Sequence, residues 1–118
     1  MAKSVDFNDL FSGEDKLLSI QVLDEAGAQV DISGCTIEWS LRRHPHSTGT
    51  PLIAKTTASG ITIRTQTGVD KGYFDVRLLA ADLAALVGVY HHVALVTDPT
   101  ANKTVVIGGW ATIKKSGI

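Results

Sequence analysis

The sequence predicts an all-β fold, an antiparallel β-sandwich of seven or eight strands with one short helical corner. Short apolar runs alternate with polar residues along most of the chain, and clusters of Gly, Asp, Asn, Ser and Pro separate them at regular intervals. Only residues 80–86 have the composition of a helix. With 118 residues, the chain has the size of one domain, which buries roughly two-thirds of its unfolded surface around a single core.

Residues 1–14 differ from the rest because their apolar side chains follow neither a period of two nor one of 3.6. We interpret them as an N-terminal arm, with the sandwich over residues 15–114 and a solvated tail at 115–118. The arm is too apolar to remain in water. It either folds back on its own sandwich or docks on a neighbouring subunit, in which case deletion of residues 1–12 leaves a folded domain that cannot assemble. The candidate partner-binding side chains are Val5, Phe7, Leu10 and Phe11.

Two strands are predicted in the first third of the sandwich. Residues 16–23 alternate as a strand and are followed by a turn at 24–27 and a short return segment, which together indicate a hairpin. Residues 36–42 have the clearest alternation, with Ile37, Trp39 and Leu41 facing inward and polar residues between them. This pattern is typical of an antiparallel strand with one solvated face, and we place Trp39 at the centre of the core.

The next strands follow a Pro- and Gly-containing loop at residues 43–51. Residues 52–56, 61–65 and 73–78 each predict a strand, and Phe74 and Val76 of the last one face the core.

The longest strand candidate, residues 88–98, comes after the helical corner. Tyr90, Ala94 and Val96 share one of its faces and are predicted core residues. The opposite face is also largely apolar, so we expect a central strand that is covered on both sides. A final strand at 103–113 contains Gly108 and Gly109, where we expect a bulge or bend.

Short, evenly spaced strands with a single helical turn are typical of a sandwich of the immunoglobulin type. A small barrel is the competing architecture.

Composition excludes several functional classes. A net charge of −1 and a pI near 6.4 argue against a nucleic-acid-binding protein. No apolar run approaches the roughly 18 residues of a membrane span, so we expect no membrane partner. A single cysteine allows no internal disulfide, which suits folding in a reducing cytoplasm.

The sequence contains no pattern typical of an enzyme. His44 with His46, and His91 with His92, are the only pairs that could bind a metal, and neither supplies three converging ligands. No base adjoins Cys35, which we interpret as a small buried hydrophobic residue. We therefore expect no catalytic residues, metal or cofactor.

Several segments resemble one known family. They are Gly-Glu-Asp at 13–15, Leu-Asp-x-x-Gly at 23–27, Ile-x-Trp-x-Leu-Arg at 37–42, Tyr-Phe-x-Val-x-Leu at 73–78, Gly-x-Tyr at 88–90 and Gly-Gly-Trp-Ala-Thr-Ile at 108–113. Together, over about residues 13–114, they resemble the immunoglobulin-like domains of tailed bacteriophages. The resemblance is to the N-terminal domain of baseplate upper proteins and to short single-domain phage tail proteins.

The resemblance implies a non-catalytic structural protein of the virion, made in the cytoplasm of the bacterial host. Its role would be assembly or connection in the tail, neck or baseplate. The expected partners are other phage structural proteins and further copies of the same chain, in a homo-oligomer. A capsid decoration protein is one alternative. A carbohydrate- or cell-surface-binding module is another, and its aromatic candidates are Tyr73, Tyr90 and Trp110.

Overall fold

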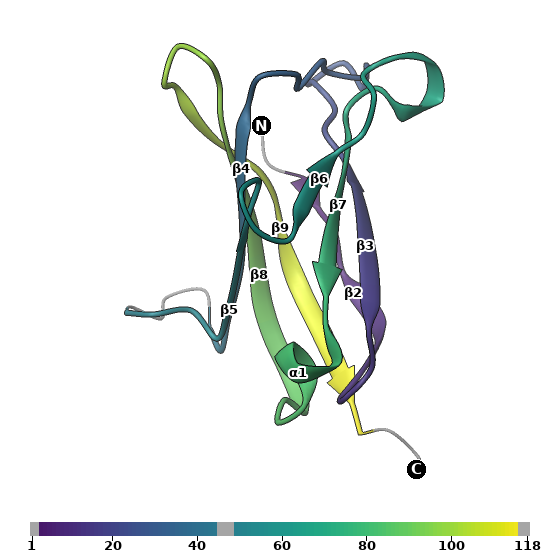
Figure 1. The fold of residues 1–118 in the computed structure, drawn as a ribbon, viewed down its shortest axis with the longest axis vertical. Helices are drawn as coiled ribbons and strands as arrows, with labels where there is room; N and C mark the ends of the chain where they lie inside the picture. Colours follow the sequence, from purple (N-terminus) through teal and green to yellow (C-terminus); the bar gives the residue numbers. More distant parts are fainter. Residues whose placement is uncertain (1–2, 45–48, 116–118) are drawn as a thin grey trace.

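The computed structural model describes residues 3–44 and 49–115, which form two stacked β-sheets (Figure 1). Sheet A contains β1 (Lys3–Ser4), β2 (Phe7–Phe11), β4 (Thr36–Arg42), β5 (Ile53–Thr56), β8 (Gly88–Thr97) and β9 (Lys103–Lys114). Sheet B contains β3 (Lys16–Gln21), β6 (Ile61–Ile63) and β7 (Tyr73–Leu78). A 3-10 turn, η1 (Gly68–Asp70), precedes β7, and the helical corner α1 (Ala80–Leu83) joins β7 to β8.

The strand order defines the architecture. Sheet A has the order β1-β9-β8-β4-β5, with β2 also paired to β9, and sheet B has the order β3-β7-β6. The chain is therefore an all-β, immunoglobulin-like sandwich, as predicted, and the two separate sheets exclude the barrel. The prediction of a purely antiparallel sandwich of seven or eight strands is corrected, because β1 and β2 add two short strands that pair in parallel with β9. No helix in residues 3–44 and 49–115 is long and apolar enough to cross a membrane.

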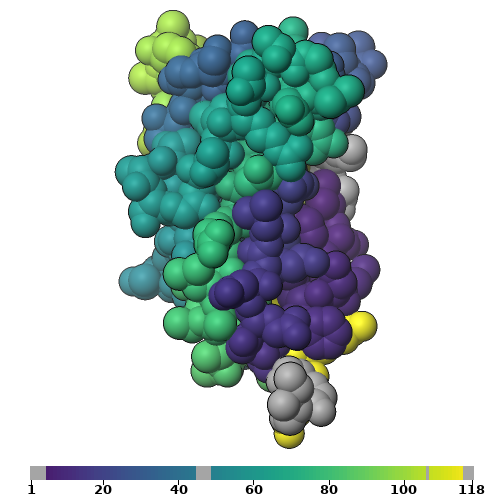
Figure 2. Space-filling view, turned by 45° about the vertical axis from the view of Figure 1, so that its right-hand side comes forward, coloured from purple at the N-terminus to yellow at the C-terminus, as the bar shows by residue number. Residues whose placement is uncertain are grey.

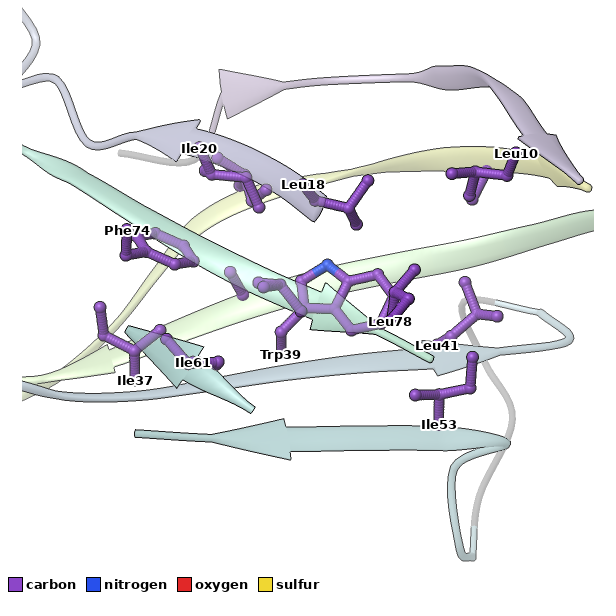
Figure 3. Close-up of a cluster of buried hydrophobic side chains, with 14 of the residues drawn as sticks. Leu10, Leu18, Ile20, Ile37, Trp39, Leu41, Ile53, Ile61, Phe74 and Leu78 are labelled. Carbon is purple, nitrogen blue, oxygen red and sulfur yellow. The ribbon is translucent and has the colours of Figure 1, made fainter. Parts of the chain in front are cut away.

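Both sheets contribute to one core, which is centred on the indole of Trp39 (Figure 3). Inward side chains of β4 and β8 meet those of β3 and β7, because alternation sends every second residue of each strand between the sheets. All eight side chains that the sequence places in the core are buried: Ile37, Trp39, Leu41, Phe74, Val76, Tyr90, Ala94 and Val96.

A tyrosine fastens the corner between β7 and β8. The Tyr90 hydroxyl donates a hydrogen bond to the Val87 carbonyl oxygen at 3.0 Å. Immunoglobulin domains have the same device two residues before a disulfide cysteine. Here the residue two positions after Tyr90 is His92, so the sheets are held together without a disulfide at this point.

Of the two alternatives for the N-terminal arm, the structure shows the first: it folds back on its own sandwich, as part of sheet A. β1 and β2 pair in parallel with β9, with Lys3 opposite Ile107 and Leu10 opposite Ile113. Leu10 is 1% exposed, and Val5 and Phe7 pack against the core. These side chains are thus built into their own domain. A register shift between Phe7 and Leu10 interrupts the alternation of inward and outward residues, which is why the sequence pattern does not predict a strand here.

The N-terminal segment also closes one side of the sandwich. Figure 2 shows its purple residues packed beside the blue-violet residues of β3. The Lys16 ammonium forms an ion pair with the Asp9 carboxylate at 2.8 Å across this junction. Removal of residues 1–12 would therefore expose part of the core, so we now expect the truncated domain to be destabilised.

Two further expectations need correction. The bulge in β9 lies at Val105–Ile107, opposite Ala94 and Leu95, and not at the two glycines. Gly109 is required for another reason: a Cβ atom there would collide with the Val5 carbonyl group and the Asp6 carboxylate. The strand predicted at residues 16–23 ends earlier, since β3 stops at Gln21. The hairpin after it is short but present: a bridge between Leu23 and Gln29 is flanked by backbone hydrogen bonds from the Asp24 N–H to the Ala28 carbonyl and from the Val30 N–H to the Val22 carbonyl.

We predict that Leu10→Ala destabilises the domain by about 2–5 kcal/mol, because it leaves a cavity beneath β2. The matched control is Leu17→Ala, which truncates a leucine that is 53% exposed and should change little. Urea unfolding followed by tryptophan fluorescence measures both. Equal effects of the two substitutions would contradict the placement of β2 in the fold.

Candidate interaction face

The chemical candidates are dispersed by the fold. His91 points outward from sheet A and His92 inward, and His46 lies outside the described residues. In the described ranges, no group of three or more His, Cys, Asp or Glu side chains could hold a metal. Cys35 is partly buried against the core, and burial raises the pKa of its thiol, which disfavours the reactive thiolate.

His92 is fully buried and joins three parts of the chain. The Trp39 indole N–H donates to His92 Nδ1 at 3.3 Å, and His92 Nε2 lies 2.6 Å from the Val5 carbonyl oxygen. An indole can only donate and a carbonyl can only accept. The ring must therefore be neutral, with its proton on Nε2 and donated to Val5. The Phe7 ring covers it at 4.9 Å between centroids.

Protonation of His92 is disfavoured by this environment. A second proton on Nδ1 would face the Trp39 N–H donor inside the core. Burial lowers the pKa of His92 below 6.5, with a smaller lowering from His91, and these effects outweigh the opposing effects of the bond to Val5 and of the nearby Asp6 carboxylate. His92 is therefore a structural group, and the geometry gives it no open coordination position.

The outer face of sheet A is the candidate interaction surface. We define it by the outward residues of β4, β5, β8 and β9. On β8 these include Val89, Val93 and Leu95, and on β9 Val105 and Trp110. Val89 is 57% exposed, and Val105 and Trp110 are each 43% exposed. An apolar sheet face that its own domain leaves open is typical of a protein contact site.

The expectation that β8 is covered on both sides is therefore wrong. Sheet B covers only the inner face, and no described segment packs over the outer one. Apolar residues on both faces of a strand indicate burial on both sides, but they do not say whether the same chain supplies the cover.

Three rows of residues cross the outer face. The central row holds the small side chains of Ala54, Ser40 and Val93, together with Gly108. One flanking row contains Arg42, His91 and Trp110, and the other contains Glu38, Leu95 and Val105. The His91 and Trp110 rings contact edge to face at 5.2 Å between centroids.

A shallow hollow of 280 Å³ lies over the central row and the Glu38 row. Its lining includes Ser40, Ala54, Val93, Leu95 and Val105, with Glu38 and Arg42 at its polar positions. The hollow follows from the small residues of the central row, and it can receive a projecting side chain from a partner.

The aromatic residues of the carbohydrate alternative are not gathered at one site. Tyr90 is buried, and the Arg64 guanidinium covers the Tyr73 ring at 4.8 Å. Only Trp110 is open, and the His91 ring contacts it. The three rings therefore do not form a stacking platform.

Comparison with solved structures finds a distant similarity. A structure described as that of murine CRIg is similar, with a TM-score of 0.35 and 11% sequence identity, over 96% of this chain and 92% of that chain. No protein-family model and no curated protein matches the sequence.

We predict that the free energy of unfolding falls as the pH is lowered from 7 to 5. The folded pKa of His92 lies below its unfolded value near 6.5, so the unfolded state binds the extra proton in this window. The loss approaches about 1.4 kcal/mol per pH unit at most. The lowered pKa values of Asp9, Asp75 and Asp82 act only near and below 3.8, outside the window.

Urea titrations at several pH values test this prediction. His92→Gln should flatten the dependence between pH 7 and 5, whereas His91→Gln on the outer face should retain it. An unchanged dependence in His92→Gln would show that another group is responsible.

Proposed function

We propose that the protein is a non-catalytic structural component of a bacteriophage virion, which connects other proteins in the tail, neck or baseplate. The observation that carries the proposal is the open apolar outer face of sheet A on a sandwich whose core is already complete. A surface of this kind needs a macromolecular cover in its working state.

Three further observations support a structural role. The segments from residue 13 to 113 that resemble phage immunoglobulin-like domains lie mostly in strands and turns of the sandwich. The described residues hold no cluster of metal-ligating side chains. A polar network in which Arg64 forms an ion pair with Asp75 at 2.9 Å stabilises sheet B and does not line the outer face of sheet A.

The proposal places the contact on a different surface from the one that the sequence predicts. Because Leu10, Val5 and Phe7 are committed to the core, the N-terminal residues do not serve as a free connector. The outer face of sheet A takes that role, and Val93 at its centre is the residue to disrupt.

Immunogold labelling of phage particles purified from cells that express the protein tests the proposed function directly. We expect label at the tail, neck or baseplate. Label over the head would favour the capsid decoration alternative. Particles without label, with the protein present only in the soluble fraction of the cells, would overturn a virion role.

We predict that Val93→Lys abolishes incorporation into particles while the domain stays folded, because it places a charge at the centre of the apolar contact. The matched control is Thr62→Lys on the exposed outer side of β6, which should be incorporated normally. Immunoblots of purified particles from complemented cells measure both variants. Normal incorporation of Val93→Lys would exclude the outer face as the contact.

A further inference from the structure

We propose that the outer face of sheet A binds a second copy of the same chain, through a two-fold axis that lies between the two sheets. The axis runs perpendicular to the strands, level with Ser40 and Val93. This inference deepens the proposed function, on which it rests, by naming the partner and the geometry of the contact.

The first argument is the distribution of charge. Glu38 and Arg42 point outward from β4 on either side of Ser40. Four residues along a strand separate their Cα atoms by about 13 Å, and their side chains do not pair with each other within the chain. The Glu38 side chain forms no hydrogen bond or ion pair with the described residues. Arg42 donates from Nη1 to the Gly49 carbonyl oxygen at 2.6 Å, which leaves its other guanidinium donors available.

A two-fold axis through the central row pairs these charges. It sets β4 antiparallel to its copy and brings Glu38 of each chain opposite Arg42 of the other, so two ion pairs form by symmetry. The two sheets would pack about 10 Å apart, a gap that Glu and Arg side chains span together.

The same two-fold rotation also brings the apolar residues of the two copies into contact. The central row of Ala54, Ser40, Val93 and Gly108 meets its own copy, and its small side chains permit close approach. Trp110, which projects from one flanking row, then faces Val105 at the hollow of the second copy, and His91 faces Leu95. Large side chains thus meet smaller ones in both directions.

The size of the face predicts a weak dimer. Four strands spaced about 4.8 Å apart, each with about seven residues at about 3.3 Å, cover roughly 450 Å² per copy, against about 800 Å² per partner in a standard interface. We therefore expect reversible dimers only at high concentration. Several copies held in one assembly would strengthen the contact.

Charge reversal in the full-length protein tests the proposal, with sedimentation equilibrium over a concentration series as the measurement. Glu38→Arg and Arg42→Glu should each weaken the dimer at least tenfold, because like charges then oppose each other twice. The double variant E38R/R42E should recover wild-type dimerisation. An equimolar mixture of the two single variants should form heterodimers, since both opposed pairs are again of opposite sign.

Matched controls separate this contact from a general charge effect. Glu25→Arg, in the exposed turn after β3, and Arg77→Glu, on the outer side of sheet B, change the net charge equally and should leave the dimer intact. A wild-type protein that stays monomeric, single variants with unchanged dimerisation, or a double variant that does not recover would each overturn the two-fold contact.

The outcome is distinguishable from failure of the proposed function. If the protein is a monomer in solution but is detected on the tail, the two-fold contact is overturned and the virion role stands. If it forms a charge-dependent dimer but is never found in particles, the two-fold contact stands and the virion role is overturned.

Discussion

The contact of Trp39, His92 and the Val5 carbonyl group is the interaction on which the rest of the sandwich depends. It connects the two central strands of sheet A with the N-terminal segment, at the place where immunoglobulin domains of other proteins have a disulfide next to a tryptophan. Each polar atom in this buried cluster has a partner, so the chain avoids the cost of an unsatisfied donor or acceptor. The same contact holds Val5 and Asp6 against Gly109, which explains why the backbone there must lack a side chain.

Much of the fold could be predicted from local pattern alone. β4 and β7 alternate without interruption, and the core residues Trp39 and Phe74 follow from that alternation. β2 could not be predicted in this way, because a register shift between Phe7 and Leu10 disrupts the period and because its partner β9 lies about 100 residues away. A burial signal was present in its three bulky apolar residues, but composition does not identify the surface that buries them.

The candidate site was harder to predict than the fold for a related reason. The apolar residues on both faces of β8 predict two buried faces, but sequence periodicity cannot say which face its own domain buries and which it leaves open. Once the inner face is assigned to sheet B, the exposed Val89 and Trp110 locate the open one. A role of Glu38 and Arg42 in binding can be proposed only once the outer face is known to be open and apolar, because on a solvated strand they would be ordinary surface charges.

The parallel pairing of β1 and β2 with β9 also has a consequence for the order of folding during synthesis. β1 and β2 are synthesised about 100 residues before β9, the strand with which they pair, since Leu10 lies opposite Ile113. Sheet A therefore cannot close until β9 has emerged from the ribosome, and Phe7 and Leu10 stay without their final cover until then. Such non-local pairing slows folding and exposes apolar segments to aggregation.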